Sequence, residues 1–356
     1  MDDTERDGER GGTQARGEAV EGGPGARARV SRAEFLRLAG AATAGLALVA
    51  AGCGGASPPP PAPASSAPAP SSTPGASAAS PAASESPTAA YLAVVKGKDA
   101  AAITRAAVAA IGGMGRFMHK GADVIVKPNI CVGYRGPEYA ATTNPDVVAT
   151  IVRLCLEAGA KRVRVMDNPF GSPADVAYDV SGIAAAVKKA GGVMQIMSPV
   201  LFADTAIPKG RAIKRYPIYR DILEADLVVN VPIAKQHSLS RLTLGGKNLL
   251  GCVTDRQNLH FDIGQTVADL TSVIRPGLTV VDAVRILTAN GPTGGDLADV
   301  KRTNTVIASA DIVAADSCAA TLFGLSGNDI PSVVASAAMG LGEIHVNKAR
   351  VATLRV

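Results

Sequence analysis

The chain has 356 residues, of which 47% are hydrophobic and 3% aromatic, with no tryptophan, and its formal net charge is +5. This length is sufficient for one sizeable α/β core or for two small domains. The basic residues are scattered and the aromatic residues are few, so a surface that stacks nucleic-acid bases is not expected. The mild positive charge favours a small anionic molecule as the partner instead.

The first segments of the chain have the features of a targeting region rather than of a folded domain. Residues 1–30 are rich in glycine, arginine and acidic residues, a composition typical of disorder. A basic flank then precedes an apolar run from Leu38 to Ala51, which ends in small residues before Cys53. Such a run is short for a membrane span but has the layout of an export signal. Residues 31–53 are therefore predicted to be an export and lipoprotein signal, with Cys53 as the lipidated residue.

The details of this signal leave the export route open. The stretch "SRAEFLR" resembles a twin-arginine motif with Ala33 in place of the second arginine, and "AAGC", which ends at Cys53, resembles a lipoprotein cleavage box. Residues 54–88 consist almost entirely of proline, alanine, serine and glycine, which predicts an extended, disordered linker. We therefore expect an exported protein that its lipid anchors to the outer face of the cytoplasmic membrane. A plain low-complexity tail would leave the apolar run unexplained.

From residue 89 onward, short β-branched runs alternate with patterns of helical spacing. Asp99 and Asn144 stand at N-cap positions of two predicted helices, and residues 174–192 are predicted to form one further helix. Strands separated by helices favour parallel pairing, and nearly continuous apolar runs favour a sheet covered on both faces. Residues 89–356 are therefore predicted to be an α/β domain with a layered, mostly parallel sheet and flanking helices, arranged as one unit or as two lobes around a cleft.

Polar residues follow several of the predicted strands. Lys127 and Asn129 follow "DVIV", Asp167 follows "VRVM", Lys235 comes after "VVNVP", and Asp282 follows "LTVV". Open parallel sheets bind ligands beyond the carboxyl ends of their strands, so residues at these positions are candidates for a common site. Each of them could instead start a turn or cap a helix.

Residues 234–260 hold two of the chain's four histidines around a Gly-Gly-Lys-Asn step. We expect Lys235 and His237 to lie in a loop beyond a strand, and Asn248 to start a short helix whose free N–H groups suit an anion. Histidine is the usual acid–base group and a common metal ligand, and a lysine in a dry pocket can be a nucleophile. The alternative is that these are hydrogen-bonded loop residues.

Together these patterns give a set of candidate site residues. The predicted catalytic residues are His237, Lys247 and Asp167. The predicted cofactor-binding residues are Lys127, Asn129, Lys235, Gly245, Gly246, Asn248 and Arg256. The predicted metal ligand is His260. The cysteines of the folded part, Cys131, Cys155, Cys252 and Cys318, show no C-x-x-C spacing, so no iron–sulfur cluster is expected in this chain.

Residues 91–356 resemble the family called domain of unknown function number 362, through "VIVKPNI", "MDNPFG", "VDAV" and the whole stretch 234–260. Members of that family occur alone or beside ferredoxin modules, which implies a separate iron–sulfur protein as a partner. The same stretch is similar to the cofactor-holding segment of nickel-pincer lactate racemases. That similarity implies that Lys247 carries a cofactor, His260 ligates nickel and His237 acts as an acid–base group. His119, the one earlier histidine, does not match the further acid–base histidine of those enzymes.

Three functions therefore stay open. The first is an exported, lipid-anchored enzyme that uses a transition metal, with nickel as the leading candidate, or a bound cofactor to act on a small anionic substrate. The second is a ligand-binding lipoprotein without catalysis, and the third is a redox accessory protein that docks on an iron–sulfur partner. We favour the first, because capture of an anion does not require the acid–base groups His237 and His260.

Overall fold

The computed structural model describes residues 91–346 and 351–356. The predicted disordered region (1–30), the predicted signal (31–53) with Cys53 and the predicted linker (54–88) lie outside the described residues. Within the two described ranges, no helix has both the length and the apolar character that a bilayer span requires.

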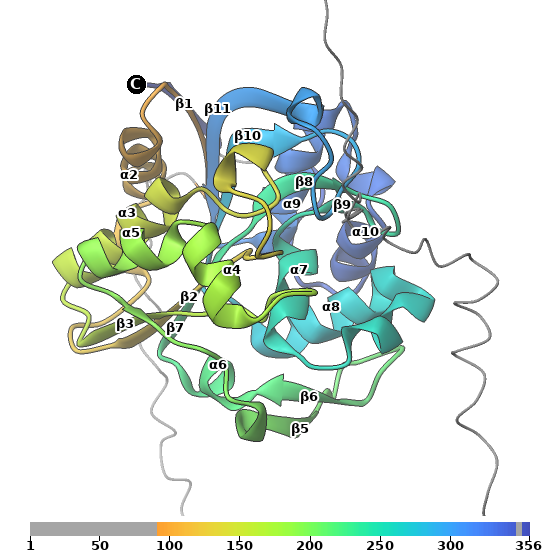
Figure 1. Ribbon diagram of the computed structural model, residues 1–356. Coiled ribbons are helices and arrows are strands. Elements are labelled where there is room, and N and C mark those ends of the chain that lie inside the picture. The colour runs from red at the N-terminus through yellow and green to blue at the C-terminus, as the bar shows by residue number, and fades with distance from the viewer. Residues whose placement is uncertain (1–90, 347–350) are drawn as a thin grey trace, which may run out of the picture. The chain divides into compact units, whose positions relative to one another are not determined.

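One large sheet of ten strands organises the described residues (Figure 1). Its main path runs β12 (Val351–Arg355), β1 (Leu92–Lys96), β11 (Val300–Ser309), β10 (Leu278–Leu287), β7 (Leu227–Val231), β2 (Asp123–Pro128), β3 (Arg162–Val165) and β4 (Val193–Met194). Two more strands, β8 (Ile233–His237) and β9 (Arg241–Thr243), extend from β10. A separate antiparallel pair is formed by β5 (Phe202–Ala206) and β6 (Arg215–Tyr219).

Helices cover both faces of this sheet (Figure 1). One face packs against α2 (Ala100–Ala110), α3 (Pro145–Glu157) and α5 (Ile183–Lys189), and the other against α8 (Ile263–Ile274), α9 (Ile312–Ala320) and α10 (Pro331–Ala338). Alternate residues of β2 enter the two cores, because successive side chains of a strand point to opposite faces: Val124 and Val126 lie in one core and Ile125 in the other. The predicted layered α/β fold is confirmed.

The predicted helix starts are confirmed where the side chain itself caps the helix. Asp99 accepts N–H bonds from Ala101 and Ala102 at the start of α2, and Asn144 accepts one from Asp146 at the start of α3. The prediction of one helix over residues 174–192 is wrong. The segment forms two helices, α4 (Ala174–Val180) and α5, because Gly182 between them has a left-handed backbone with φ of 71°.

Strand direction could not be read from the local pattern. Pairs such as β2·β3 and β2·β7 are parallel as expected, whereas β11 is antiparallel to both β1 and β10.

The placement of Lys235 and His237 in a loop is also wrong, because both residues belong to β8, which pairs with β10 and β9. The short helix of this region, α7 (Gly245–Asn248), begins three residues earlier than expected.

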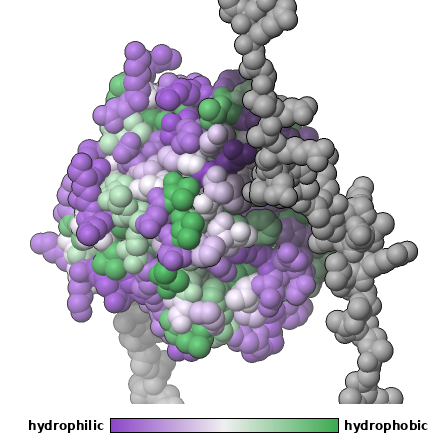
Figure 2. Space-filling model, in the orientation of Figure 1, coloured by the Kyte–Doolittle hydropathy of each residue, from purple (hydrophilic) through white to green (hydrophobic). Residues whose placement is uncertain are grey.

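The surface seen in Figure 2 carries its apolar side chains in small groups separated by hydrophilic ones. Large exposed apolar residues include Tyr134, Phe170, Leu239 and Phe261. Scattered exposed apolar residues are normal on a folded protein, whereas a large continuous patch would indicate a docking face. Two of these exposed residues, Phe170 and Leu239, line the cleft described below.

Candidate functional site

A cleft of about 850 Å³ lies beyond the carboxyl ends of β2, β3 and β7. The predicted site residues that line it are Lys127, Asn129, Asp167, Lys235, His237, Lys247, Asn248, Arg256 and His260. Apart from Gly245 and Gly246, all nine predicted catalytic, cofactor-binding and metal-ligating residues thus line one cavity, at the sheet edge where parallel strands place their ligands.

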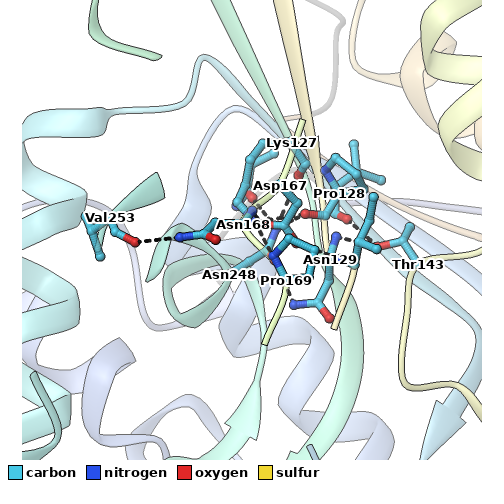
Figure 3. A network of polar contacts seen from close by, with 12 residues as sticks. Lys127, Pro128, Asn129, Thr143, Asp167, Asn168, Pro169, Asn248 and Val253 are labelled. Carbon is cyan, nitrogen blue, oxygen red and sulfur yellow. Dashed lines mark hydrogen bonds and ion pairs between the residues drawn. The ribbon is translucent and has the colours of Figure 1, made fainter. Parts of the chain in front are cut away.

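Lys127 forms the centre of a buried polar network under this cleft (Figure 3). Its side chain is only 1% exposed, and its ammonium group donates to Asp167 Oδ1 at 2.6 Å, to the carbonyl of Pro128 at 2.8 Å and to Asn248 Oδ1 at 3.1 Å. An ammonium group has three protons, so every donor of Lys127 has a partner. Lys127 therefore has no proton left to donate to a ligand in this arrangement.

Asp167 is also held by several hydrogen bonds. Its Oδ1 accepts from Lys127 and from the N–H of Asn168, and its Oδ2 accepts from the N–H of Ile130 at 2.6 Å. A catalytic base needs a free lone pair aimed at the substrate, whereas these oxygens orient backbone and lysine around them. The predicted catalytic residue Asp167 thus lies at the cleft, but its contacts are those of a structural anchor.

Lys235 repeats this pattern with uncharged partners. It is 1% exposed, and its ammonium group donates to Asn129 Oδ1 at 2.9 Å and to the carbonyls of Ala141 and Pro292 at 2.6 and 2.8 Å. Burial lowers the pKa of Lys235. Asn129 in turn donates to Asn248 Oδ1 at 3.0 Å, which joins both lysines in one set of contacts. We call Lys127, Asn129, Asp167, Lys235 and Asn248 the buried network.

Lys247 differs from both of these lysines. It lies on α7, is half-buried and lines the cleft, and no residue in the described part of the chain forms an ion pair or hydrogen bond with its side chain. Burial, followed by the positive charges of Lys235 and Arg256, lowers the pKa of Lys247 to about 8. At pH 7 about a tenth of this amine would be uncharged, far more than for an ordinary lysine, and the uncharged amine is the state in which a lysine is a nucleophile or base.

The two histidines of the cleft have opposite protonation patterns, which their partners dictate. His237 Nδ1 accepts the backbone N–H groups of Leu239 at 3.1 Å and Ser240 at 3.4 Å, so the ring proton sits on Nε2. His260 Nδ1 lies 3.2 Å from the carbonyl of Gln257, which can only accept, so in the neutral ring the proton is on Nδ1 and Nε2 carries a lone pair. His237 therefore offers a donor to the cleft and His260 an acceptor.

The charge around His237 keeps it in the neutral form. Burial, followed by the positive charges of Lys247, Lys235 and His260, lowers the pKa of His237 to about 3. Lys247, His237 and His260 thus line the same cleft. We call these three residues the open trio, because the Nζ of Lys247 and both Nε2 atoms have no hydrogen-bond partner in residues 91–346 and 351–356.

The cleft carries an excess of positive charge. Its lining includes four cationic side chains, Lys127, Lys235, Lys247 and Arg256, and two carboxylates, Asp167 and Asp255. Arg256 is fixed by one bond from Nη2 to the carbonyl of Pro169 at 3.0 Å. An excess of fixed positive charge in a concave site favours anionic ligands.

Gly245 and Gly246 do not line the cleft. Their N–H groups donate to Asp316 Oδ1 and Oδ2 at 2.6 and 2.8 Å, so the N-terminus of α7 binds an internal carboxylate rather than a ligand. Asp282, which follows a predicted strand, is also turned away from the cleft. It accepts the N–H groups of Asn144 and Val284, and its burial raises its pKa to about 6.

The residues present fit a metal only in part. A histidine that ligates a metal usually donates its other ring nitrogen to a carbonyl, which is the arrangement of His260. His237 carries its proton on the nitrogen that faces the cleft, so it does not offer a ligand atom there. In the described residues no group of three or more His, Cys, Asp and Glu side chains is placed to hold a metal ion. A metal held at His260 would need further ligands from a bound cofactor.

Sequence reasoning missed several residues of the cleft. Cys131 lines it, and its thiol lies 3.6 Å from the carbonyl of Pro292, which also binds Lys235. The nearest signal in the sequence was the position of Cys131 just after Asn129. Phe170 also lines the cleft and is 51% exposed, although nothing but its proximity to Asp167 indicated this.

The chain is similar in sequence to one relative and, more distantly, to solved structures. It is 28% identical over 246 residues, 65% of this chain and 72% of the relative, to the thylakoid-associated protein sll1697 of Synechocystis. Among solved structures, the lactate racemase apoprotein of Thermoanaerobacterium thermosaccharolyticum has a TM-score of 0.39 and 11% identity, over 62% of this chain and 54% of that chain. A protein from Thermotoga maritima has a TM-score of 0.29 and 11% identity, over 46% of each chain. This chain therefore spans about half the length of each of these two structures.

The match to a family covers more than half of the chain and includes the strands and loops that build the cleft. Residues 124–321 match the family described as "Domain of unknown function (DUF362)". The matched range begins in β2 and ends just after α9, so it contains the buried network and the open trio. The protein belongs to the DUF362 family.

Proposed function

We propose that the protein is an enzyme that acts on a small anionic substrate in this cleft with the help of a metal or a bound cofactor. The observation that carries the proposal is the open trio: His237, Lys247 and His260 face one cavity without hydrogen-bond partners for their cleft-facing nitrogens within the described residues. Reactive groups that the fold leaves unpaired in a pocket are candidates for work on a ligand.

The preference for an anion follows from the excess of cationic side chains. Because the donors of Lys127 and Lys235 are all used within the protein, these two lysines would act through their charge. Lys247 and Arg256 would contact the anion directly, since both are half-buried and line the cleft. The cleft volume of about 850 Å³ also leaves room for a cofactor beside a small substrate.

The two imidazoles favour catalysis over simple capture. His237 offers a neutral N–H hydrogen-bond donor and the neutral form of His260 a lone pair, so the site contains a group that can polarise a substrate oxygen and a group that can accept a proton. Lys247, with a pKa of about 8, is suited to hold a cofactor or to act as a nucleophile. His260 would be the protein's ligand to a transition metal, with nickel as the first candidate, and the bound group would supply the other ligands.

We also propose that the enzyme is exported and held at the outer face of the cytoplasmic membrane by a lipid on Cys53. The basic flank, the apolar run and the following linker support this proposal. Replacement of Cys53 by serine should release the protein from the detergent phase of a membrane extract, while the wild type stays in it. A wild-type protein without a lipid mass on Cys53 would contradict the anchor and leave the enzyme proposal untouched.

The enzyme proposal is tested on the full-length protein purified from its native host. We expect stoichiometric metal, a mass increment on Lys247, or both, measured by elemental analysis and by mass spectrometry of the intact protein and its peptides. His260→Ala should lose the metal, and Lys247→Met should lose the adduct. Lys98→Met serves as the matched control, because Lys98 is an exposed lysine outside the cleft.

Binding of a simple anion separates the enzyme from a binding protein. Calorimetric titration with inorganic phosphate should give about tenfold weaker binding in Lys247→Met than in Lys98→Met, since removal of one direct charged contact costs about 1–2 kcal/mol. Phosphate binding that depends on Lys247, in a protein without metal or adduct, would favour the ligand-binding lipoprotein. Phosphate binding that is unchanged in Lys247→Met would contradict the proposed anion site.

A further inference from the structure

Asp316 is a buried carboxylate with an uncommon set of partners. It lies on α9 and is 3% exposed, and its two oxygens accept the N–H groups of Gly245 and Gly246 at 2.6 and 2.8 Å. No described residue forms an ion pair with it. A buried carboxylate is costly unless it is compensated, and here the compensation comes from the first two N–H groups of α7.

The helix that Asp316 binds, α7, needs tertiary contacts to fix its position. α7 contains four residues, and two of them are glycine. A helix of this length is unstable by itself, and glycine is a poor helix former, so tertiary contacts must fix where α7 starts and where it points. Asp316 fixes the start, and Asn248 fixes the end through bonds to Asn230 and to the backbone of Lys127.

The two glycines are explained by the approach of this carboxylate. A Cβ atom on Gly245 would lie 2.7 Å from Asp316 Oδ1 and 3.0 Å from a side-chain carbon of Ile312. A Cβ atom on Gly246 would lie 3.1 Å from a side-chain carbon of Val267. Side chains at these positions would push α7 away from α9. The Gly-Gly step thus allows contact with Asp316 rather than with a ligand.

Lys247 follows these glycines directly and lies between the two fixed points of α7. We propose that Asp316 is a positioning residue for Lys247: by binding both glycine N–H groups it sets the orientation of α7 and thereby the place of the Lys247 amine in the cleft. This inference rests on the proposed role of Lys247. Burial raises the pKa of Asp316 to about 7, which agrees with a carboxylate that only backbone N–H groups compensate.

The test measures the pH midpoint of Lys247 acetylation by acetic anhydride in full-length protein whose intact mass shows Lys247 free of an adduct, with exposed Lys188 as the internal standard. The variant is Asp316→Asn, which keeps the shape but turns an N–H₂ group towards one of the two N–H donors. We expect the midpoint, near pH 8 in the wild type, to rise by about one unit as the amine moves out of its site towards water. The charges that act on the pKa of Lys247 are those of Lys235, Arg256 and Cys131, so the shift reports displacement rather than the lost charge of Asp316.

Asp269→Asn is the matched control. Asp269 is also a fully buried carboxylate that accepts backbone N–H groups, but its partners are Arg211, Ala212 and Ile213, which do not line the cleft. This variant should lose stability without a change in the Lys247 midpoint. A midpoint that is the same in the wild type, Asp316→Asn and Asp269→Asn would overturn the proposal, as would an equal shift in both variants.

Gly245→Ala provides a second route if Asp316→Asn does not fold. The added methyl group separates α7 from Asp316 while the carboxylate remains, so the Lys247 midpoint should again rise, and an unchanged midpoint would count against the positioning role. A wild-type midpoint near the ordinary lysine value of about 10.5 would instead contradict the proposed function of Lys247. Restoration of the midpoint by Asp316→Glu, relative to Asp316→Asn, would support a role of the carboxylate itself.

Discussion

Lys127 and Lys247 lie in the walls of one cleft and yet are in opposite states. Lys127 is sealed from solvent and donates all of its protons to Asp167, Pro128 and Asn248. Lys247 is half-buried and has no partner for its side chain in the described residues. Both are predicted site residues of the same chemical type, and only the surroundings separate an anchor from a reactive group.

The same contrast extends to the two sets of residues around these lysines. The buried network is closed by hydrogen bonds among its members and to neighbouring backbone groups, whereas each member of the open trio has one side-chain nitrogen without a partner in the described residues. Closed polar networks rigidify a site, and unpaired groups within them are available for chemistry. The buried network therefore supports the cleft, and the open trio is the part that would meet a ligand.

The largest effect should come from breaking the buried network at Lys127. Lys127→Met leaves the carboxylate of Asp167 buried without its cation, so the free energy of unfolding should fall by about 3–5 kcal/mol. Lys247→Met removes a cation that has no partner and should change it by less than about 1 kcal/mol. Urea denaturation of both variants measures the difference. Equal losses in the two variants would remove the distinction between anchor and reactive group.

Between pH 7 and pH 4, His237 should change the free energy of unfolding by about 3 kcal/mol. Its pKa in the folded protein is about 3, below the value of about 6.5 in the unfolded chain, so the unfolded state binds more protons between these values. The stability that His237 contributes should therefore be lost as pH falls from 6.5 towards 3.

The raised pKa values of Asp316 and Asp282 act in the opposite direction, so the test compares the wild type with His237→Asn, which keeps both carboxylates. Urea denaturation should show that the stability advantage of the wild type over His237→Asn shrinks between pH 7 and pH 4. An advantage that is independent of pH would show that His237 takes up its proton at the same pH in the folded protein as in the unfolded chain, which contradicts the lowered pKa.

The smallest change in the free energy of unfolding is expected at Gly251, whose backbone lies close to the buried network. A Cβ atom on Gly251 would lie 2.0 Å from Asp167 Oδ1 and 2.5 Å from Lys127 Nζ. Gly251→Ala should therefore lower the free energy of unfolding by about 1–3 kcal/mol, because the Lys127–Asp167 pair must shift. Gly115→Ala is the control, since a Cβ atom there meets nothing within 4 Å. Similar melting temperatures for the two variants would mean that the pair adapts without cost.

Much of the fold could be predicted from local patterns. The caps at Asp99 and Asn144 were readable because a capping side chain acts on the two or three residues that follow it. The convergence of Lys127, Asn129 and Asp167 followed from parallel strands that end at one edge of a sheet. The position of His237 on β8 was missed although its register partner, Arg241 of β9, is close in the chain; the pairing of β8 with β10, about fifty residues further along, could not be read from a local pattern.

The amino-acid sequence by itself indicated many of the residues that gather at the cleft, since the ends of the strands follow from short-range patterns. The tertiary structure decided what each of them can do there. The backbone N–H of Leu239 places the ring proton of His237 on Nε2, and the carbonyl of Gln257 places that of His260 on Nδ1. Asp167 forms an ion pair with Lys127, whereas Lys247 has no partner in the described residues. The physical reason is that protonation and hydrogen-bond saturation depend on burial and on partners distant in the chain, which no local pattern contains.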